Sequence, residues 1–252
     1  MSATPQIALP NEKKARSNGK SYRRQLMRTG NLPALPIGVR SDRKPWLPDD
    51  RRSAIVDVGC GWGTLLVELQ QLGYSNLMGV EGDQHLAREA AERCGNASSS
   101  IHIAHADAID FFEHTDLRFD RVLLFHVLEH FTSKDGCRLL GAIKECLTER
   151  GRVVVEVPNM SSITGTNMQC SDLTHSTAFT EYSLKQLLDN AGFEKVSVHC
   201  MPPALRWWRL GRHGSGIAWH LNHRLHLLLY SLTMSGPRPT CFCPALLVSA
   251  EQ

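Results

Sequence analysis

The sequence predicts one α/β domain built on a mostly parallel sheet, with further segments at both ends. From Ala54 to Val157, short apolar runs rich in β-branched residues alternate with stretches whose apolar residues recur at helical spacing. Strands and helices that alternate in this way form parallel sheets covered by helices on both faces. The chain has 252 residues, 42% of them hydrophobic, which is enough for one sizeable core.

The expected elements of the core follow one another from residue 54. Strands are expected at residues 54–58, 76–81, 101–104, 119–125 and 151–157, and helices at residues 63–72, 84–94 and 134–148. Residues 159–170 are rich in Ser, Thr, Gly and Asn, so they are expected to form an irregular loop above the ligand site.

The last elements of the core are a capped helix and two strands. Thr180 to Ser183 has the polar residues of a helix start, and Leu184, Leu187 and Leu188 form the buried face of that helix. Alternating residues predict a sixth strand at 193–200 and a seventh at 245–250.

A turn with alternating glycines follows the first strand. Gly59, Gly61 and Gly63 let a ligand lie against the bare backbone and tolerate positive φ angles. About twenty residues further on, Glu81 ends the second strand, where a carboxylate can accept hydrogen bonds from both ribose hydroxyls. The spacing differs from the Gly-x-Gly-x-x-Gly pattern of dinucleotide sites, and Asp57 lies two residues before the first glycine.

These residues resemble the first motif of class I S-adenosylmethionine-dependent methyltransferases, which have a Rossmann-like, seven-stranded, mostly parallel sheet whose last strand is antiparallel. The resemblance implies S-adenosyl-L-methionine as cofactor and S-adenosyl-L-homocysteine as product. It also implies that Asp107 binds the adenine amino group, a role compatible with capping the next helix. The implied cofactor-binding residues are Asp57, Gly59, Cys60, Gly61, Gly63, Glu81, Asp107, Ala108 and His126.

The run from Phe119 to Phe131 resembles the fourth-strand motif of small-molecule methyltransferases, including those of quinone biosynthesis. It implies that His126 lies at the strand end near the methionine part of the cofactor, and His130 is expected to be structural. Two histidines and Glu129 at this spacing also raise a metal interpretation, but their order differs from the His-Glu-x-x-His of zinc peptidases. We therefore expect no metal site.

The stretch from Ser171 to Leu188 is similar to one in methyltransferases of bacterial cell-surface polysaccharide clusters. His175 is the candidate general base, because imidazole titrates near neutral pH and because this stretch follows the acceptor-side strand. Asp172 and Thr174 are expected to bind the acceptor, and Asp172 is also placed to orient His175. The alternative is that His175 only binds substrate or caps a helix.

Three functions follow from these patterns. The first is O-methylation of a sugar or a sugar-containing cell-surface precursor. The second is O-methylation of a phenolic or quinone precursor at the membrane, and the third is cofactor binding without catalysis, as in a regulatory protein. The acceptor is accordingly expected to be a small molecule or a glycan precursor.

Charge divides the chain into three parts. Residues 1–52 carry 12 Lys and Arg against 4 Asp and Glu, residues 53–202 carry 11 against 20, and residues 203–252 carry 5 against 1. We expect a basic N-terminal arm at 1–52 that is partly disordered or a lid, and the cofactor-binding core at 53–202. A helical insertion at 203–240 and the final strand within 241–252 complete the chain. Basic ends suit anionic partners, but no nucleic-acid-binding motif is present, so nucleic acid is not expected.

The insertion contains an amphipathic helix. Apolar residues recur on one stripe, at Ile217, Leu221, Leu225, Leu228 and Leu232. Tryptophans and arginines precede them, so residues 205–234 suit peripheral contact with an anionic membrane. Packing of this stripe on the domain's own sheet and a homodimer contact remain as alternatives.

Cysteine usage and hydropathy indicate the compartment. The eight cysteines include no C-x-x-C pair, so neither a disulfide framework nor a structural metal is indicated. Residues 1–20 hold no signal-type apolar segment, and no window is long and apolar enough to span a bilayer. The expected location is the cytoplasm.

Overall fold

The computed structural model describes residues 46–97, 101–199, 211–233 and 238–251, without the side chains of residues 96, 97, 163, 211–220 and 222. The sequence interpretations of residues 1–45, and of the tryptophans at 207 and 208, lie outside this part. The elements of the first half are β1 (Ala54–Val58), α2 (Thr64–Gln71), β2 (Asn76–Glu81), α3 (Gln84–Ala97), β3 (Ile101–His105), α4 (Ala108–His114) and β4 (Phe119–Phe125). Those of the second half are η1 (Leu128–His130), α5 (Ser133–Glu145), β5 (Leu147–Pro158), α6 (Ile163–Cys170), α7 (Glu181–Asn190), β6 (Glu194–His199), α8 (Gly211–Thr233) and β7 (Ala245–Glu251).

The sheet has seven strands in the order β3-β2-β1-β4-β5-β7-β6. Strands β1 to β5 pair in parallel, and β7 inserts antiparallel between β5 and β6. This confirms the expected Rossmann-like fold, including the antiparallel last strand. The strand order reverses between β1 and β4, and ligands of such sheets bind at the carboxyl ends of the strands at that point.

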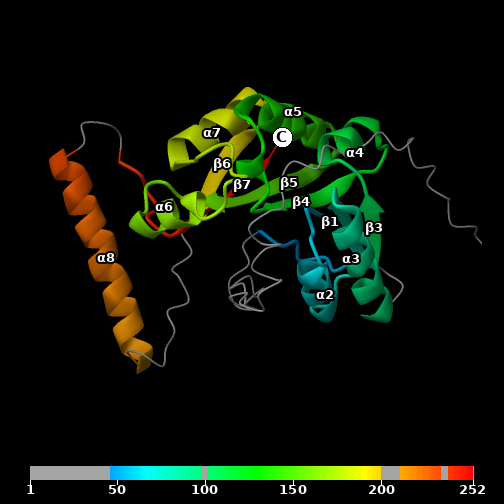
Figure 1. Ribbon diagram of the computed structural model, residues 1–252, viewed down its shortest axis with the longest axis horizontal. Coiled ribbons are helices and arrows are strands. Elements are labelled where there is room, and N and C mark those ends of the chain that lie inside the picture. Colours follow the sequence, from blue (N-terminus) through cyan, green and yellow to red (C-terminus); the bar gives the residue numbers. More distant parts are fainter. Residues whose placement is uncertain (1–45, 98–100, 200–210, 234–237, 252) are drawn as a thin grey trace, which may run out of the picture.

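Helices cover both faces of the sheet (Figure 1). Side chains alternate along each strand, so Val56 and Val58 pack on the face of α4, α5 and α7, while Ile55 packs on the face of α2 and α3. Trp46 joins the second core, where its ring meets Phe125 edge-on at a centroid distance of 5.3 Å. Trp46, which precedes the expected boundary at residue 53, is therefore part of the packed body.

The expectation of an irregular loop over residues 159–170 is wrong, because Ile163–Cys170 forms α6. A Cβ at Gly165 would lie 1.9 Å from the Asn159 carbonyl oxygen, so the glycine allows this helix to pack directly on the end of β5. Asn159 is buried and donates to the carbonyls of Cys241 and Cys243, which fixes the same junction to the segment before β7. Tertiary contacts of this kind stabilise a short helix whose polar composition predicts none. The helix expected at 134–148 also ends early, and residues 147–150 belong to β5.

The expected amphipathic helix is present as α8, which lies apart from the sheet, at the left end of the molecule in Figure 1. Its contact with the domain comes from the polar side, where His223, His226 and Tyr230 pack around the ring of Phe242. Four leucines of the predicted stripe are instead 50–73% exposed, and these are Leu221, Leu225, Leu228 and Leu232. The alternative prediction, that this stripe packs on the domain's own sheet, is therefore wrong.

Candidate active site

The turn after β1 is shaped by three glycines with left-handed backbones. The φ angles of Gly59, Gly61 and Gly63 are 64°, 56° and 70°. A Cβ at Gly59 would lie 2.7 Å from the Val127 side chain, and one at Gly63 would lie 2.8 Å from the Cys94 sulfur. A Cβ at Gly61 would meet no atom within 4 Å, so this glycine borders open space. The turn thus has the bare backbone that a closely approaching ligand requires.

Glu81 connects this turn to the end of β2. Its Oε2 accepts the N–H of Gly61 and its Oε1 accepts the N–H of Asp83, each at 2.9 Å. Burial, reinforced by the charges of Asp57 and Glu81, raises the pKa of the Cys60 thiol, which therefore stays protonated and unreactive. Two buried carboxylates beside the turn favour a ligand with positive charge.

The third group of the predicted cofactor set follows β3. Asp107 caps α4, because its Oδ1 accepts the N–H groups of Ile109 and Asp110 at 2.9 and 3.2 Å. Its side chain is exposed, and Ala108 begins the helix. The turn, Glu81 and Asp107 follow the carboxyl ends of three adjacent strands, so the structure brings the predicted residues to one edge of the sheet.

At the end of β4, His126 is held between two carboxylates. Its Nδ1 lies 3.1 Å from Glu129 Oε1, and its Nε2 lies 3.1 Å from Glu156 Oε1. Burial alone would lower the pKa of His126, but the hydrogen bonds to Glu129 and Glu156 outweigh it and raise this pKa to about 9. The ring is therefore a cation that donates from both nitrogens. Its φ of 55° is unusual for a residue with a side chain.

A second histidine, His130, is oriented by the loop after α6. Thr174 donates its single hydroxyl hydrogen to Asp172 at 2.7 Å, so the same oxygen accepts a bond of 2.9 Å from His130 Nδ1. Although the residue is exposed overall, partial burial of its ring, together with the neighbouring His175, lowers the pKa of His130. Burial would raise the pKa of Asp172, but the two hydrogen bonds from Thr174 outweigh it and hold this pKa below its usual value.

His175 lies close to His130 and Glu129. Its Nδ1 is 2.9 Å from the Gln169 carbonyl oxygen, an acceptor that requires the hydrogen to be on Nδ1. Its Nε2 is 4.0 Å from Glu129 Oε1, and its ring centroid is 4.7 Å from that of His130. Backbone hydrogen bonds from residues 176 and 177 to the Glu129 carbonyl fix this loop on η1.

Residues 32–198, about two thirds of the chain, match the model of a family described as a methyltransferase domain. The chain belongs to this methyltransferase family. Its cofactor is S-adenosyl-L-methionine. The open space at Gly61, beside Glu81, is where the sequence predicts its adenosine. No curated protein matches the sequence significantly.

Solved structures of methyltransferases share the fold. A SAM-dependent methyltransferase from Archaeoglobus fulgidus is 19% identical, with 80% of this chain and 86% of that chain covered and a TM-score of 0.60. A complex between the Haloferax volcanii Trm112 methyltransferase activator and a methyltransferase contains a chain that is 15% identical, with 82% of this chain and 84% of that chain covered and a TM-score of 0.58. The mitomycin 7-O-methyltransferase MmcR is 16% identical, with 80% of this chain and 49% of that chain covered and a TM-score of 0.56. At these identities the likeness concerns the fold alone.

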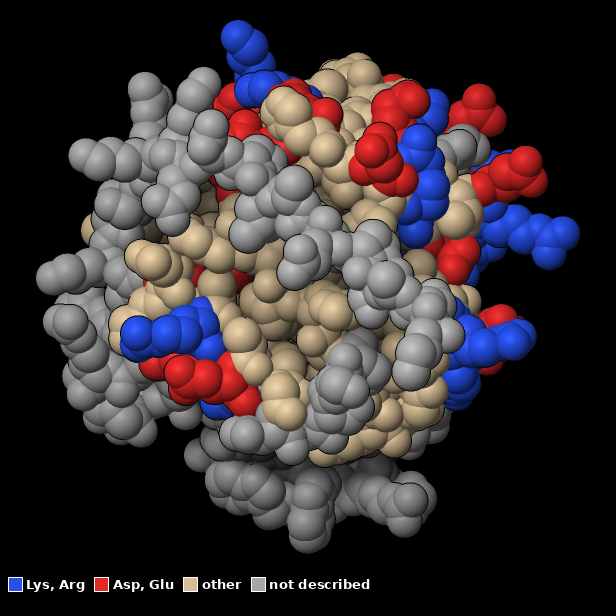
Figure 2. Space-filling view, turned by 90° about the vertical axis from the view of Figure 1, so that its right-hand side faces the viewer, with Lys and Arg blue, Asp and Glu red and all other residues tan. Residues whose placement is uncertain are grey.

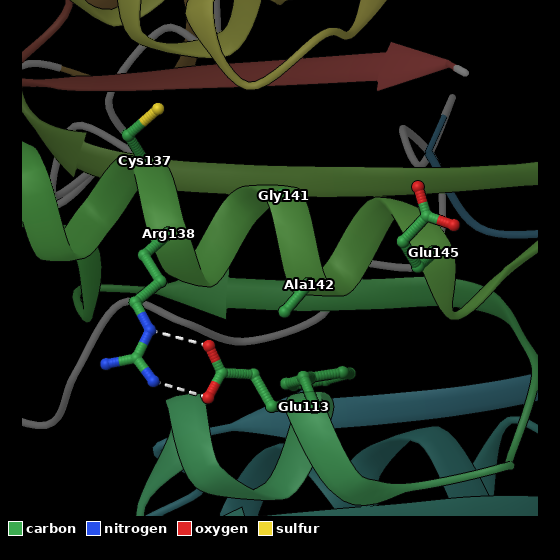
Figure 3. A pocket seen from close by; sticks show the side chains of 7 residues that line it. Glu113, Cys137, Arg138, Gly141, Ala142 and Glu145 are labelled. Carbon is green, nitrogen blue, oxygen red and sulfur yellow. Dashed lines mark hydrogen bonds and ion pairs between the residues drawn. The ribbon is translucent and has the colours of Figure 1, made fainter.

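A surface groove of about 350 Å³ lies between α4 and α5 of the methyltransferase (Figure 3). Arg138 closes one side of it through a bidentate ion pair with Glu113. The groove shares no residue with the predicted cofactor or acceptor sets, and it lies outside the helices rather than at the carboxyl edge of the sheet. We therefore assign it no part in methyl transfer.

The face at the β3 edge shows acidic and basic side chains side by side around uncharged surface (Figure 2). Among the residues described on this face there is no extended patch of one sign. The field that this view presents to a partner is therefore mixed.

Sequence reasoning missed two residues of the site. Glu129 entered only the rejected metal interpretation, and Glu156 was not singled out. Both hold His126, as described above. A signal for Glu156 was available, because it is the only charged residue in the apolar run Val153–Pro158.

Proposed function

We propose that this methyltransferase transfers the methyl group to a hydroxyl of a sugar or of a sugar-containing cell-surface precursor in the cytoplasm. The supporting observation is the polar group formed by Asp172, Thr174 and His175 against η1, at the same edge as the glycine turn. Carboxylate, hydroxyl and imidazole groups together suit an acceptor with several hydroxyls. The proposed cofactor contacts remain those of the sequence analysis, from Asp57 to His126.

Methyl transfer to such an acceptor needs alignment and removal of one proton. The cofactor supplies an activated methyl group on a sulfonium, and the acceptor oxygen forms a C–O bond while the C–S bond breaks and its electron pair goes to sulfur. The protein holds the acceptor oxygen in line with that bond and takes the hydroxyl proton. S-adenosyl-L-homocysteine and the methyl ether are the products.

His175 is the proposed base. Because its Nδ1 hydrogen is engaged by the Gln169 carbonyl, the lone pair on Nε2 is free to accept the hydroxyl proton. Asp172 and Thr174 bind neighbouring hydroxyls of the acceptor in this proposal. Leu173, fully exposed between them, offers an apolar contact to the face of a sugar ring.

The test compares nucleotide- and lipid-linked sugars with phenols as acceptors, with His175→Gln as the variant and His114→Gln as the control. His114 is exposed on α4 and bonds to its own helix, so its replacement leaves the acceptor side intact. The proposal expects turnover with sugars, a loss on the order of 10²–10⁴-fold in His175→Gln and unchanged S-adenosylhomocysteine binding. Full turnover by His175→Gln would refute the base, and turnover of phenols alone would refute the acceptor class. Cofactor uptake without product on any acceptor would favour the regulatory alternative.

A second candidate, methylation of a phenolic or quinone precursor at a membrane, is supported by α8. Its row of exposed leucines, from Leu221 to Leu232, is a surface that peripheral membrane helices share. Among the described residues, no helix is both long enough and apolar enough to cross a bilayer. Co-sedimentation with anionic vesicles tests this candidate, and a change of mass with concentration in light scattering would indicate instead that the leucines form a homodimer contact.

A further inference from the structure

Three side chains of the acceptor side converge although they come from different segments. Glu129 and His130 belong to η1, and His175 belongs to the loop after α6. Each offers one ligand atom, and these atoms lie within 4.8 Å of one another. The ligand atoms of a tetrahedral site with bonds of about 2.0–2.1 Å are roughly 3.3 Å apart, so small side-chain rotations would close the group around an ion.

The hydrogen bonds around the two histidines leave the correct atoms free. His175 Nδ1 donates to the Gln169 carbonyl, and His130 Nδ1 donates to Thr174, which in turn donates to Asp172. Both rings therefore keep their lone pairs on Nε2. Metal-binding histidines are oriented in the same way, with the second nitrogen bonded to a carbonyl, a carboxylate or a group hydrogen-bonded to one.

Glu129 supplies the second, independent observation. Its side chain is fully buried, and its Oε2 has no hydrogen-bond partner among the described residues. The other oxygen, Oε1, accepts from His126, which fixes the orientation of the carboxylate. A buried carboxylate oxygen without a partner costs free energy unless a ligand satisfies it.

We propose that Glu129, His130 and His175 form a site for one divalent transition-metal ion that binds the acceptor oxygen. Two imidazoles and one carboxylate form a set that suits Mn²⁺, Fe²⁺ or Zn²⁺ and leaves coordination positions for substrate. His130 is exposed, so these positions are open to solvent. The inference rests on the proposed methyl transfer to a hydroxyl and revises one part of it, because a bound ion would replace His175 as the group that activates the acceptor. The ion takes the Nε2 lone pair of His175 and lowers the pKa of the bound hydroxyl, whose proton leaves to solvent as the C–O bond forms.

The experiment uses the full chain freed of metal with a chelator, and Mn²⁺ as the probe. Calorimetry and Mn²⁺ electron paramagnetic resonance measure binding to the wild type, His130→Gln, His175→Gln and the control His114→Gln. The proposal expects about one bound ion per chain and a higher melting temperature with Mn²⁺. Both site variants are expected to bind at least roughly tenfold more weakly, while the control binds as the wild type does.

The outcomes separate this inference from the proposed function. Equal S-adenosylhomocysteine binding by all four proteins shows that the variants are folded and that the cofactor half is intact. Wild-type protein that binds this compound but no Mn²⁺ and no Zn²⁺ overturns the metal site and leaves His175 as the base. Binding of Mn²⁺ with equal affinity by the site variants also overturns it. Failure to bind the cofactor product defeats the proposed function, whatever the metal result.

Discussion

Replacement of Gly61 by Ala tests the shape of the glycine turn. Gly61 has a φ of 56° and open space where a Cβ would lie. The left-handed backbone of an alanine costs about 1–2 kcal/mol, and the new methyl clashes with nothing in the free protein. This strain is present with and without ligand, so it lowers stability rather than affinity. Affinity falls because the methyl enters the space proposed for the ligand, and a steric cost of about 1–2 kcal/mol there would weaken binding roughly 5- to 30-fold.

Gly73→Ala is the matched control. Gly73 has a φ of 92°, and the nearest atom to its added Cβ is an Arg51 carbon at 4.0 Å, so backbone strain again dominates. Both variants should lose similar stability in urea unfolding, on the order of 1–2 kcal/mol. Only Gly61→Ala should bind S-adenosylhomocysteine more weakly in calorimetry. Wild-type affinity for S-adenosylhomocysteine in Gly61→Ala, or an equal loss of affinity in Gly73→Ala, would refute the assignment of this turn to cofactor binding.

Three further predictions concern stability. Glu181→Gln should cost about 1–3 kcal/mol in urea unfolding at pH 7, because the buried carboxylate accepts two hydrogen bonds from Thr240. Burial would raise the pKa of Glu181, but the hydrogen bonds to its carboxylate outweigh burial and lower this pKa. The stability difference between wild type and variant should therefore shrink as the pH falls below about 4.5. A difference that does not change with pH would contradict this reasoning. His126→Ala should cost about 3–5 kcal/mol in the same assay, because two carboxylates lose their shared cation; a cost below 1 kcal/mol would contradict that ion pairing. Leu228→Ser with Leu232→Ser should change stability by less than about 1 kcal/mol, since both side chains are exposed, and a larger loss in thermal unfolding would show that the chain itself covers them.

The fold could be predicted because its signals are local. Strands β2 and β4 match the expected ranges, since buried parallel strands are apolar runs bounded by polar residues or glycine. The α6 helix could not be predicted, because its reason lies in the close approach of Gly165 to Asn159. The sequence also could not predict that the leucines of α8 point away from the domain. Periodicity defines an apolar stripe but does not say what covers it.

The proposed cofactor half and the proposed acceptor half of the site also differ in how far the sequence predicts them. The proposed cofactor half comes from one continuous stretch in which a carboxylate lies at or just after each strand end, so Glu81 could be named from its place after the glycine turn and Asp107 from the family resemblance. The proposed acceptor half needs η1 to meet the loop after α6, and α5, β5 and α6 lie between these two segments in the sequence. His130 and Thr174 are 44 residues apart, and nothing in their spacing predicts a bond of 2.9 Å.

The edge of the sheet uses positive φ angles for two different purposes. After β1 they occur at glycines, because a Cβ would meet Val127 at Gly59 and Cys94 at Gly63, and at Gly61 it would enter the open space proposed for the ligand. After β4 the positive φ occurs at His126, where a glycine would relieve strain of order 1–3 kcal/mol but would remove the cation between Glu129 and Glu156. Loss of that cation would leave two carboxylates uncompensated, which costs at least as much as the strain. The strained histidine is therefore the more stable choice, and the η1 helix that follows it brings Glu129 and His130 against the loop after α6.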